Sequence, residues 1–137
     1  MVRMSVFYQG EKHCKLVHEP SGSSIQTDAP KDNQGKGEKF SPTDLLGASL
    51  GGCLLTIMAI IAERDGVSLV GSHAEVEKEM VQQPRRRIGS LRTKVYLPAK
   101  IPLEYRKKLE TAAHQCPVRE SLHPEIDTSI TFIYSLT

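Results

Sequence analysis

The sequence predicts a single α+β domain over residues 1–137, with antiparallel sheets, a long central helix and a second, shorter helix. Short segments in which apolar and polar residues alternate lie near both ends and in the middle of the chain. A long apolar segment follows the first group of these strands, and a segment with helical spacing precedes the last. Because the strands are grouped, an antiparallel α+β fold is favoured over a doubly wound parallel sheet.

The first 27 residues are predicted to form a three-stranded antiparallel meander. Alternating apolar residues mark strands within residues 2–8, 14–16 and 25–27. Between them, residues 9–11 (Gln-Gly-Glu) and 20–23 (Pro-Ser-Gly-Ser) have the composition of turns. A sheet at the start of the chain follows from this pattern.

A helix start is marked more sharply than any other boundary. Residues 28–39 are polar and contain proline and glycine, so they are expected to form an exposed loop. The run Ser-Pro-Thr-Asp from Ser41 then places serine at the N-cap, proline at the first helical position and an acid at the third, close to a capping box. The helix is predicted to continue to about Asp65, where Gly66 ends it.

This helix is apolar enough to raise the question of a membrane span. Residues 45–62 carry no charge, and Gly47 and Gly51 have the GxxxG spacing of membrane helix pairs. The segment also contains several small or polar residues, and aromatic belts are missing from its flanks. We therefore expect a helix buried in a soluble fold, whose small residues let another backbone approach closely.

The second half of the chain is predicted to add three strands and one helix. Residues 70–80 and 91–97 alternate like half-buried strands, separated by a turn at Pro84. Residues 105–116 carry apolar side chains at helical spacing, and residues 130–134 alternate as a final strand.

Composition excludes several functional classes. Lys plus Arg is 18 and Asp plus Glu is 16, so the net charge of +2 favours neither nucleic acid nor a membrane surface as partner. The three cysteines are too few for a disulfide-stapled secreted domain, and the N-terminus lacks the apolar core of a signal peptide, so a reducing cytoplasm is expected. A chain this short has a thin core, which favours a homodimer.

Two of the three cysteines are candidates for chemistry. Cys53 lies within the apolar helix, where burial alone would make it an inert small hydrophobe. Cys116 precedes Pro117, and if it caps a short helix, the free backbone N–H groups there would stabilise its thiolate. Cys14 has no such neighbours and is expected to be structural. There is no CxxC motif.

Metal and cofactor binding are not expected. His114, Cys116 and His123 lie close in sequence, but their spacing matches no standard zinc pattern and a fourth ligand is missing. The arginines at positions 85–87 are expected to form a solvated hairpin end.

Two motifs together resemble the OsmC/Ohr family of organic hydroperoxide resistance proteins, in a divergent branch. Ser-Pro-Thr-Asp-Leu-Leu from Ser41, followed by small residues up to Gly52-Cys53, resembles that family's central helix. Cys116-Pro117-Val118, with the later Leu-His-Pro and closing strand, resembles its second cysteine motif. The resemblance implies an interwoven α+β homodimer with active sites at the subunit interface.

The resemblance also implies an activity, namely thiol peroxidase chemistry on organic hydroperoxides. Cys53 would attack the peroxide, Cys116 would resolve the product as a disulfide, and a dithiol or lipoylated protein would restore both thiols. The helix-end argument instead favours Cys116 as the better thiolate, so the two assignments conflict.

The chain departs from the best-known peroxidase branches at two places. Thr43 stands ten residues before Cys53, where those branches carry a glutamate, and the first hairpin contains no arginine. Lys12, Arg64 and Arg87 are the candidate replacement cations, since a cation stabilises a thiolate. The alternative function is therefore a non-enzymatic OsmC-like dimer that binds a small hydrophobic ligand or senses oxidants.

Overall fold

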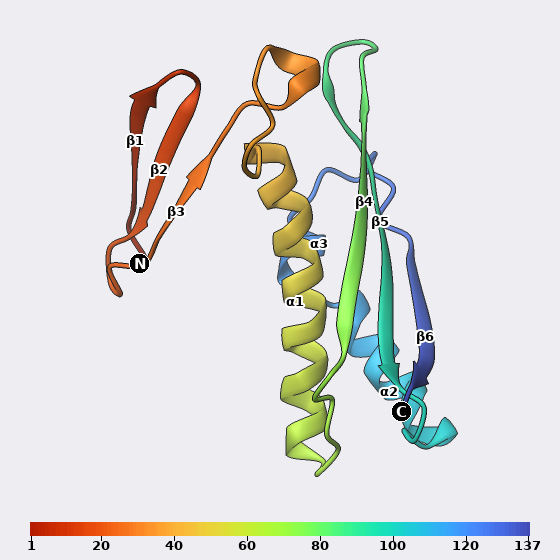
Figure 1. The fold of residues 1–137 in the computed structure, drawn as a ribbon. Coiled ribbons are helices and arrows are strands. Elements are labelled where there is room, and N and C mark those ends of the chain that lie inside the picture. The colour runs from red at the N-terminus through yellow and green to blue at the C-terminus, as the bar shows by residue number, and fades with distance from the viewer. The chain divides into compact units, whose positions relative to one another are not determined.

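The computed structural model describes all 137 residues, arranged as two compact units, Met1–Leu46 and Gly47–Thr137 (Figure 1). We call them the N-terminal and C-terminal units. In chain order the elements are β1 (Met4–Gly10), β2 (His13–His18), β3 (Ser24–Thr27), the 3₁₀ helix η1 (Lys31–Asn33), α1 (Pro42–Arg64), β4 (His73–Val81), β5 (Arg87–Pro98), α2 (Leu103–His114), α3 (Pro117–Glu120) and β6 (Ile130–Leu136). The predicted α+β class is confirmed.

The N-terminal unit contains the predicted meander. Strands β1, β2 and β3 form an antiparallel sheet in chain order. The first hairpin turns at Glu11 and Lys12, both in the left-handed region with φ of 51° and 64°. Two such residues in succession match the twist of the flanking strands, which explains the tight connection.

The apolar residues of β1 are exposed. Met4, Val6 and Tyr8 have exposed fractions of 67%, 63% and 70%, and Ile25 on β3 is 50% exposed. The alternation predicted a strand correctly, but this apolar set is not buried in the single chain. A large exposed apolar set of this kind marks an interaction surface.

The prediction of an exposed loop over residues 28–39 is wrong at its first residue. Asp28 is only 1% exposed, because the loop folds back over it through η1 and the turn that follows. Its backbone N–H donates to the carbonyl of Phe40 at 3.1 Å, and the amide of Gly35 donates to the carbonyl of Pro30 at 2.9 Å. These main-chain bonds give the loop a defined structure that polar composition alone does not reveal.

Helix α1 begins as the sequence predicts. Ser41 Oγ accepts the Asp44 N–H at 3.1 Å, and Asp44 Oδ2 accepts the Ser41 N–H at 2.9 Å. This reciprocal pair is the capping box, with aspartate in the acidic position. The helix ends at Arg64, and Gly66 follows with φ of 72°.

The C-terminal unit is a three-stranded sheet, in the order β4-β5-β6, covered on one face by helices. The core joins α1, β5 and α2 and consists of fully buried side chains that include Leu50, Leu54, Met58, Leu91, Val95 and Leu109. By length and composition α1 is also apolar enough to cross a membrane. Its buried face packs in this core, which fits the predicted core helix.

Strand β6 departs from the antiparallel prediction. It pairs with β5 in parallel, with Val95 opposite Phe132, whereas β4 pairs with β5 antiparallel. The connection from β5 to β6 runs through α2 and α3, and a crossover of that length permits a parallel neighbour. Strand β4 begins at His73 and not at residue 70 as predicted, so Val70 lies before the strand and is 90% exposed.

Two glycines let α1 approach the sheet closely, as predicted from the small residues of this segment. A Cβ on Gly47 would lie 3.2 Å from Leu91 Cδ2, and one on Gly51 would lie 3.0 Å from Val76 Cγ2. Both distances are tighter than ordinary carbon contacts of about 3.5–4.0 Å. A Cβ on Gly52 would meet no atom within 4 Å.

Gly51→Ala is expected to be less stable than Gly52→Ala by about 1–3 kcal/mol, the usual cost of overpacking. Both changes gain the same helix propensity, so the difference in their free energies of unfolding isolates the contact with Val76. Urea denaturation of the two variants measures it. Equal stabilities would contradict the close packing of α1 on β4.

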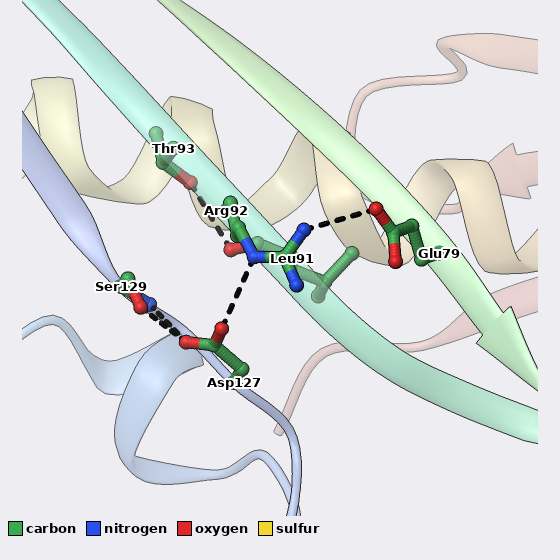
Figure 2. Close-up of polar contacts among 6 residues, drawn as sticks. All are labelled: Glu79, Leu91, Arg92, Thr93, Asp127 and Ser129. Carbon is green, nitrogen blue, oxygen red and sulfur yellow. Dashed lines mark hydrogen bonds and ion pairs between the residues drawn. The ribbon is translucent and has the colours of Figure 1, made fainter.

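A polar cluster fixes the segment that returns from α3 to β6 (Figure 2). Arg92 donates to Glu79 at 2.9 Å and to Asp127 at 3.2 Å, and the Ser129 hydroxyl and N–H both donate to Asp127. The Ser129 hydroxyl, its N–H and Arg92 together lower the pKa of Asp127. Exposed ion pairs contribute little stability, so the cluster mainly sets the register of this segment against β5.

A second polar group joins α2 to the end of α1. Asp65 Oδ2 accepts from Lys108 Nζ at 2.6 Å and from the Tyr105 hydroxyl at 2.7 Å. Burial, followed by this hydrogen bond, raises the pKa of Tyr105 to about 12. The contact fixes α2, which leads into Cys116, against α1, which carries Cys53.

Candidate functional site

Cys53 lies midway along α1 and is half-buried at the edge of the core. Gly51 before it is buried against Val76, whereas Gly52 is exposed. The space beside Gly52 leaves the helix surface next to Cys53 open. Cys53 is therefore neither a fully buried hydrophobe nor a fully exposed thiol.

Cys116 lies at the junction between α2 and α3 and is completely buried. It is the N-cap residue of α3, with Pro117 at the first helical position, and its Sγ accepts the Arg119 N–H at 3.5 Å. The predicted capping role of Cys116 is confirmed.

The structure brings the two candidate cysteines together. Burial raises the pKa of the Cys116 thiol, and a hydrogen bond with Cys53 and the charge of a Cys53 thiolate raise it further. All of these effects favour a neutral Cys116 thiol beside Cys53. Both residues belong to the C-terminal unit, from α1 and from the α2–α3 junction.

The prediction that the N-terminus of α3 stabilises a Cys116 thiolate is wrong in the direction of the pKa shift. The backbone N–H groups of Arg119 and Val118 do lower the pKa of Cys116, as the capping argument requires. Desolvation is the larger effect and reverses the outcome. The pKa of the Cys116 thiol is therefore raised overall, which favours its protonated form.

Cys14 lies apart from this pair in the sequence and belongs to the N-terminal unit. It occupies β2, opposite Tyr8 on β1 and Thr27 on β3, and is half-buried. Its place inside a ladder agrees with the structural role expected from the sequence.

Of the three candidate cations for the missing arginine, Arg64 lies far from Cys53 along α1, and Arg87 pairs with a carboxylate. Arg64 follows Cys53 by eleven residues (64 − 53) on one helix, which is about 16 Å along the axis. Arg87 pairs with Glu125 at 3.5 Å and donates to the carbonyl of Ile88. Lys12 belongs to the N-terminal unit, in the first hairpin turn.

Arg119 is a cation that the sequence reasoning did not consider. Its Nη1 donates to the carbonyl of His114 at 3.4 Å, and its Nε is buried without a hydrogen-bond acceptor. A buried N–H group of a charged side chain costs free energy when it has no acceptor, so the Arg119 Nε–H is unusual in a folded protein. The available signal was its position in the Cys-Pro-Val-Arg motif, three residues after Cys116.

The three residues considered as metal ligands from the sequence, His114, Cys116 and His123, do not come together. The His114 ring packs edge-on against Phe132, and His123 Nδ1 accepts the Glu125 N–H at 3.2 Å. A different group of possible ligands does come together in the N-terminal unit, formed by His13, Asp28 and Glu38. The sequence did not reveal this group, because residues 28–39 were expected to form an exposed loop and the burial of Asp28 was not predicted.

Comparison with known proteins identifies the fold family. The family model described as OsmC-like protein matches residues 35–131, which is well over half of the chain. The chain belongs to the OsmC-like family. This confirms the resemblance inferred from the two cysteine motifs, and membership agrees with α1 being the core helix of a soluble fold.

Solved structures of other OsmC-like proteins share the fold. A protein from Psychrobacter arcticus 273-4, described as an osmotic stress induced and detoxification response protein, is 39% identical over 96% of each chain, with a TM-score of 0.90. The organic hydroperoxide resistance protein OsmC of Legionella pneumophila is 14% identical, with 97% of this chain and 96% of that chain covered and a TM-score of 0.77. An organic hydroperoxide resistance protein from Elizabethkingia anophelis is also 14% identical, with 98% of this chain and 96% of that chain covered and a TM-score of 0.78. None of the curated proteins matches the sequence.

Proposed function

We propose that this OsmC-like protein is a thiol peroxidase that reduces organic hydroperoxides with Cys53 and Cys116. The observation that carries the proposal is the proximity of these two thiols, which lie 63 positions apart in the sequence (116 − 53). The Legionella and Elizabethkingia proteins that share the fold are organic hydroperoxide resistance proteins, which supports the same chemistry.

The reaction runs in three balanced steps. The Cys53 thiolate attacks the O–O bond and takes one oxygen as a sulfenic acid, and the other oxygen leaves as an alcohol after protonation. Cys116 then attacks the sulfenic sulfur, so that an S–S bond forms and water leaves. A dithiol, such as a lipoylated protein, reduces this disulfide by exchange and becomes oxidised itself.

The raised pKa of Cys116 suits a resolving role. A protonated Cys116 beside Cys53 can donate its S–H to the attacking sulfur, a task for which the first hairpin offers no arginine. The same proton can then leave with the hydroxyl of the sulfenic acid as water. The Arg119 guanidinium, whose Nε is buried, adds a positive charge to the Cys116 segment.

A homodimer is part of the proposal. The exposed apolar side chains of the N-terminal sheet, among them Met4, Val6 and Tyr8, would be covered by a second copy of the chain. The free thiols fit a reducing cytoplasm, where a disulfide formed by peroxide is readily reversed.

The test is peroxide consumption by the purified protein with a dithiol reductant. We expect turnover of an organic hydroperoxide and, when the reductant is withheld, a disulfide between Cys53 and Cys116 in tryptic peptides. Both free thiols remaining after peroxide treatment, together with no peroxide loss, would reject the proposal.

The alternative of a ligand-binding protein has one structural feature in its favour. An open, largely apolar cleft lies at the C-terminal end of α1, lined in part by Leu55, Ala59, Val67 and Leu69. Neither cysteine lines it, so retention of a hydrophobic ligand by a Cys53→Ser variant would separate this function from the thiol chemistry.

A further inference from the structure

A group of three potential metal ligands lies in the N-terminal unit, separate from the thiol pair. His13 begins β2, Asp28 directly follows β3, and Glu38 comes shortly before the cap of α1. His13 Nε2 lies 3.4 Å from Asp28 Oδ1 and 4.0 Å from Glu38 Oε2, and all three ligand atoms fall within 4.8 Å of one another.

The unusual member of this group is Asp28. Its side chain is 1% exposed, and Oδ2 accepts the Glu38 N–H at 3.0 Å. Its other oxygen, Oδ1, is buried and has no hydrogen-bond donor. The Glu38 N–H lowers the pKa of Asp28, burial raises it, and the charge of His13 and the backbone N–H groups of Ala29 and Lys36 lower it further, with a net lowering.

A buried carboxylate oxygen without a donor requires a positive charge beside it. The group that faces Oδ1 is His13 Nε2, which supplies that charge only when the ring is protonated. A neutral imidazole carries no charge, and in the tautomer with its proton on Nδ1 the Nε2 atom offers only a lone pair to the carboxylate oxygen. A metal cation between the two satisfies both groups at once.

The geometry matches a small first-row ion. Bonds of about 2.1 Å at tetrahedral angles place two ligand atoms about 3.4 Å apart, which is the separation of His13 Nε2 and Asp28 Oδ1. Glu38 lies slightly farther away, and its 58% exposed side chain is free to close the remaining distance. The imidazole in the set favours a transition metal over calcium or magnesium.

We propose that His13, Asp28 and Glu38 bind a divalent first-row transition-metal ion of the zinc or cobalt type, with water completing the coordination. The ion would link the start of β2, the end of β3 and the segment that leads into α1. The site differs from the thiol pair in unit, in ligand chemistry and in every residue, so it stands or falls independently of the peroxidase.

Cobalt titration of the full-length, untagged, chelator-treated chain tests this proposal. Visible absorption distinguishes nitrogen and oxygen ligands from thiolates, which add strong charge-transfer bands. We expect one equivalent of cobalt per chain without these bands, and unchanged binding in the Cys53→Ser/Cys116→Ser double variant. Zinc titration by calorimetry should give the same stoichiometry in that double variant.

Single substitutions then assign the ligands. His13→Gln and Glu38→Gln should each weaken binding by about tenfold or more, since even second-shell changes cost that much. The matched control is His18→Gln, on the same strand, whose ring hydrogen-bonds Ser21 instead. Circular dichroism checks that each variant is folded. If Asp28→Asn unfolds the chain, Glu38→Gln still tests the site, because it keeps the buried Asp28 carboxylate. Wild-type affinity in folded His13→Gln, or binding lost with the cysteines, would overturn the proposal.

Discussion

Cys53→Ser is expected to reduce peroxide turnover to the uncatalysed background. A serine hydroxyl does not ionise near neutral pH and cannot form a sulfenic acid, so the first step has no nucleophile. Steady-state consumption of an organic hydroperoxide with excess dithiol measures the effect. Cys14→Ser is the matched control, because Cys14 lies in the ladder of β2 and should leave turnover unchanged.

Cys116→Ser should behave differently from Cys53→Ser. The serine hydroxyl can still donate a hydrogen bond to the Cys53 thiolate, so the first oxidation should occur once per chain. Without a resolving thiol, the enzyme should then stall as a sulfenic acid, which a diketone reagent traps and mass spectrometry locates. If both variants turn over like the wild type, the proposed two-thiol cycle is wrong.

Much of the fold could be predicted because its signals are local. The capping box at Ser41 and Asp44 and the stop at Gly66 set the ends of α1 within a residue or two. The direction of β6 could not be predicted in this way. Alternation along residues 130–134 indicates a strand, but its neighbour and direction depend on how α2 and α3 carry the chain across the sheet.

The candidate site was found only in part, for a related reason. Motif resemblance selected Cys53 and Cys116, but the properties of the pair depend on burial and contact, which are set by tertiary structure. The sequence around Cys116 indicates the N–H groups that lower the pKa of its thiol, but it does not show the desolvation that raises this pKa. The predicted direction of the pKa shift was therefore wrong. The burial of Asp28 escaped notice because polar loop residues give no periodic signal.

The loop over Asp28 leads to the second large expected effect, in Gly35→Ala. A Cβ on Gly35 would overlap the carbonyl oxygen and the carbonyl carbon of Ala29, far inside van der Waals contact. These are main-chain atoms, so no side-chain rotation relieves the clash. We expect the loop to lose more than about 3 kcal/mol of local stability, above the ordinary range for overpacking.

Hydrogen exchange of peptides that span residues 24–40 measures this loss. Gly22→Ala is the control, because Gly22 has φ of 73° and a Cβ there would meet no atom within 4 Å, so only backbone strain of about 1–2 kcal/mol is added. Wild-type protection of the loop in Gly35→Ala would contradict the packing of Gly35 on Ala29.

Because Asp28 and Glu38 bracket this loop, the same variant should also weaken cobalt binding while every ligand atom is retained. Comparison with His13→Gln separates the loss of a ligand from the displacement of the loop, because His13→Gln should weaken cobalt binding and leave the hydrogen-exchange protection of the loop unchanged.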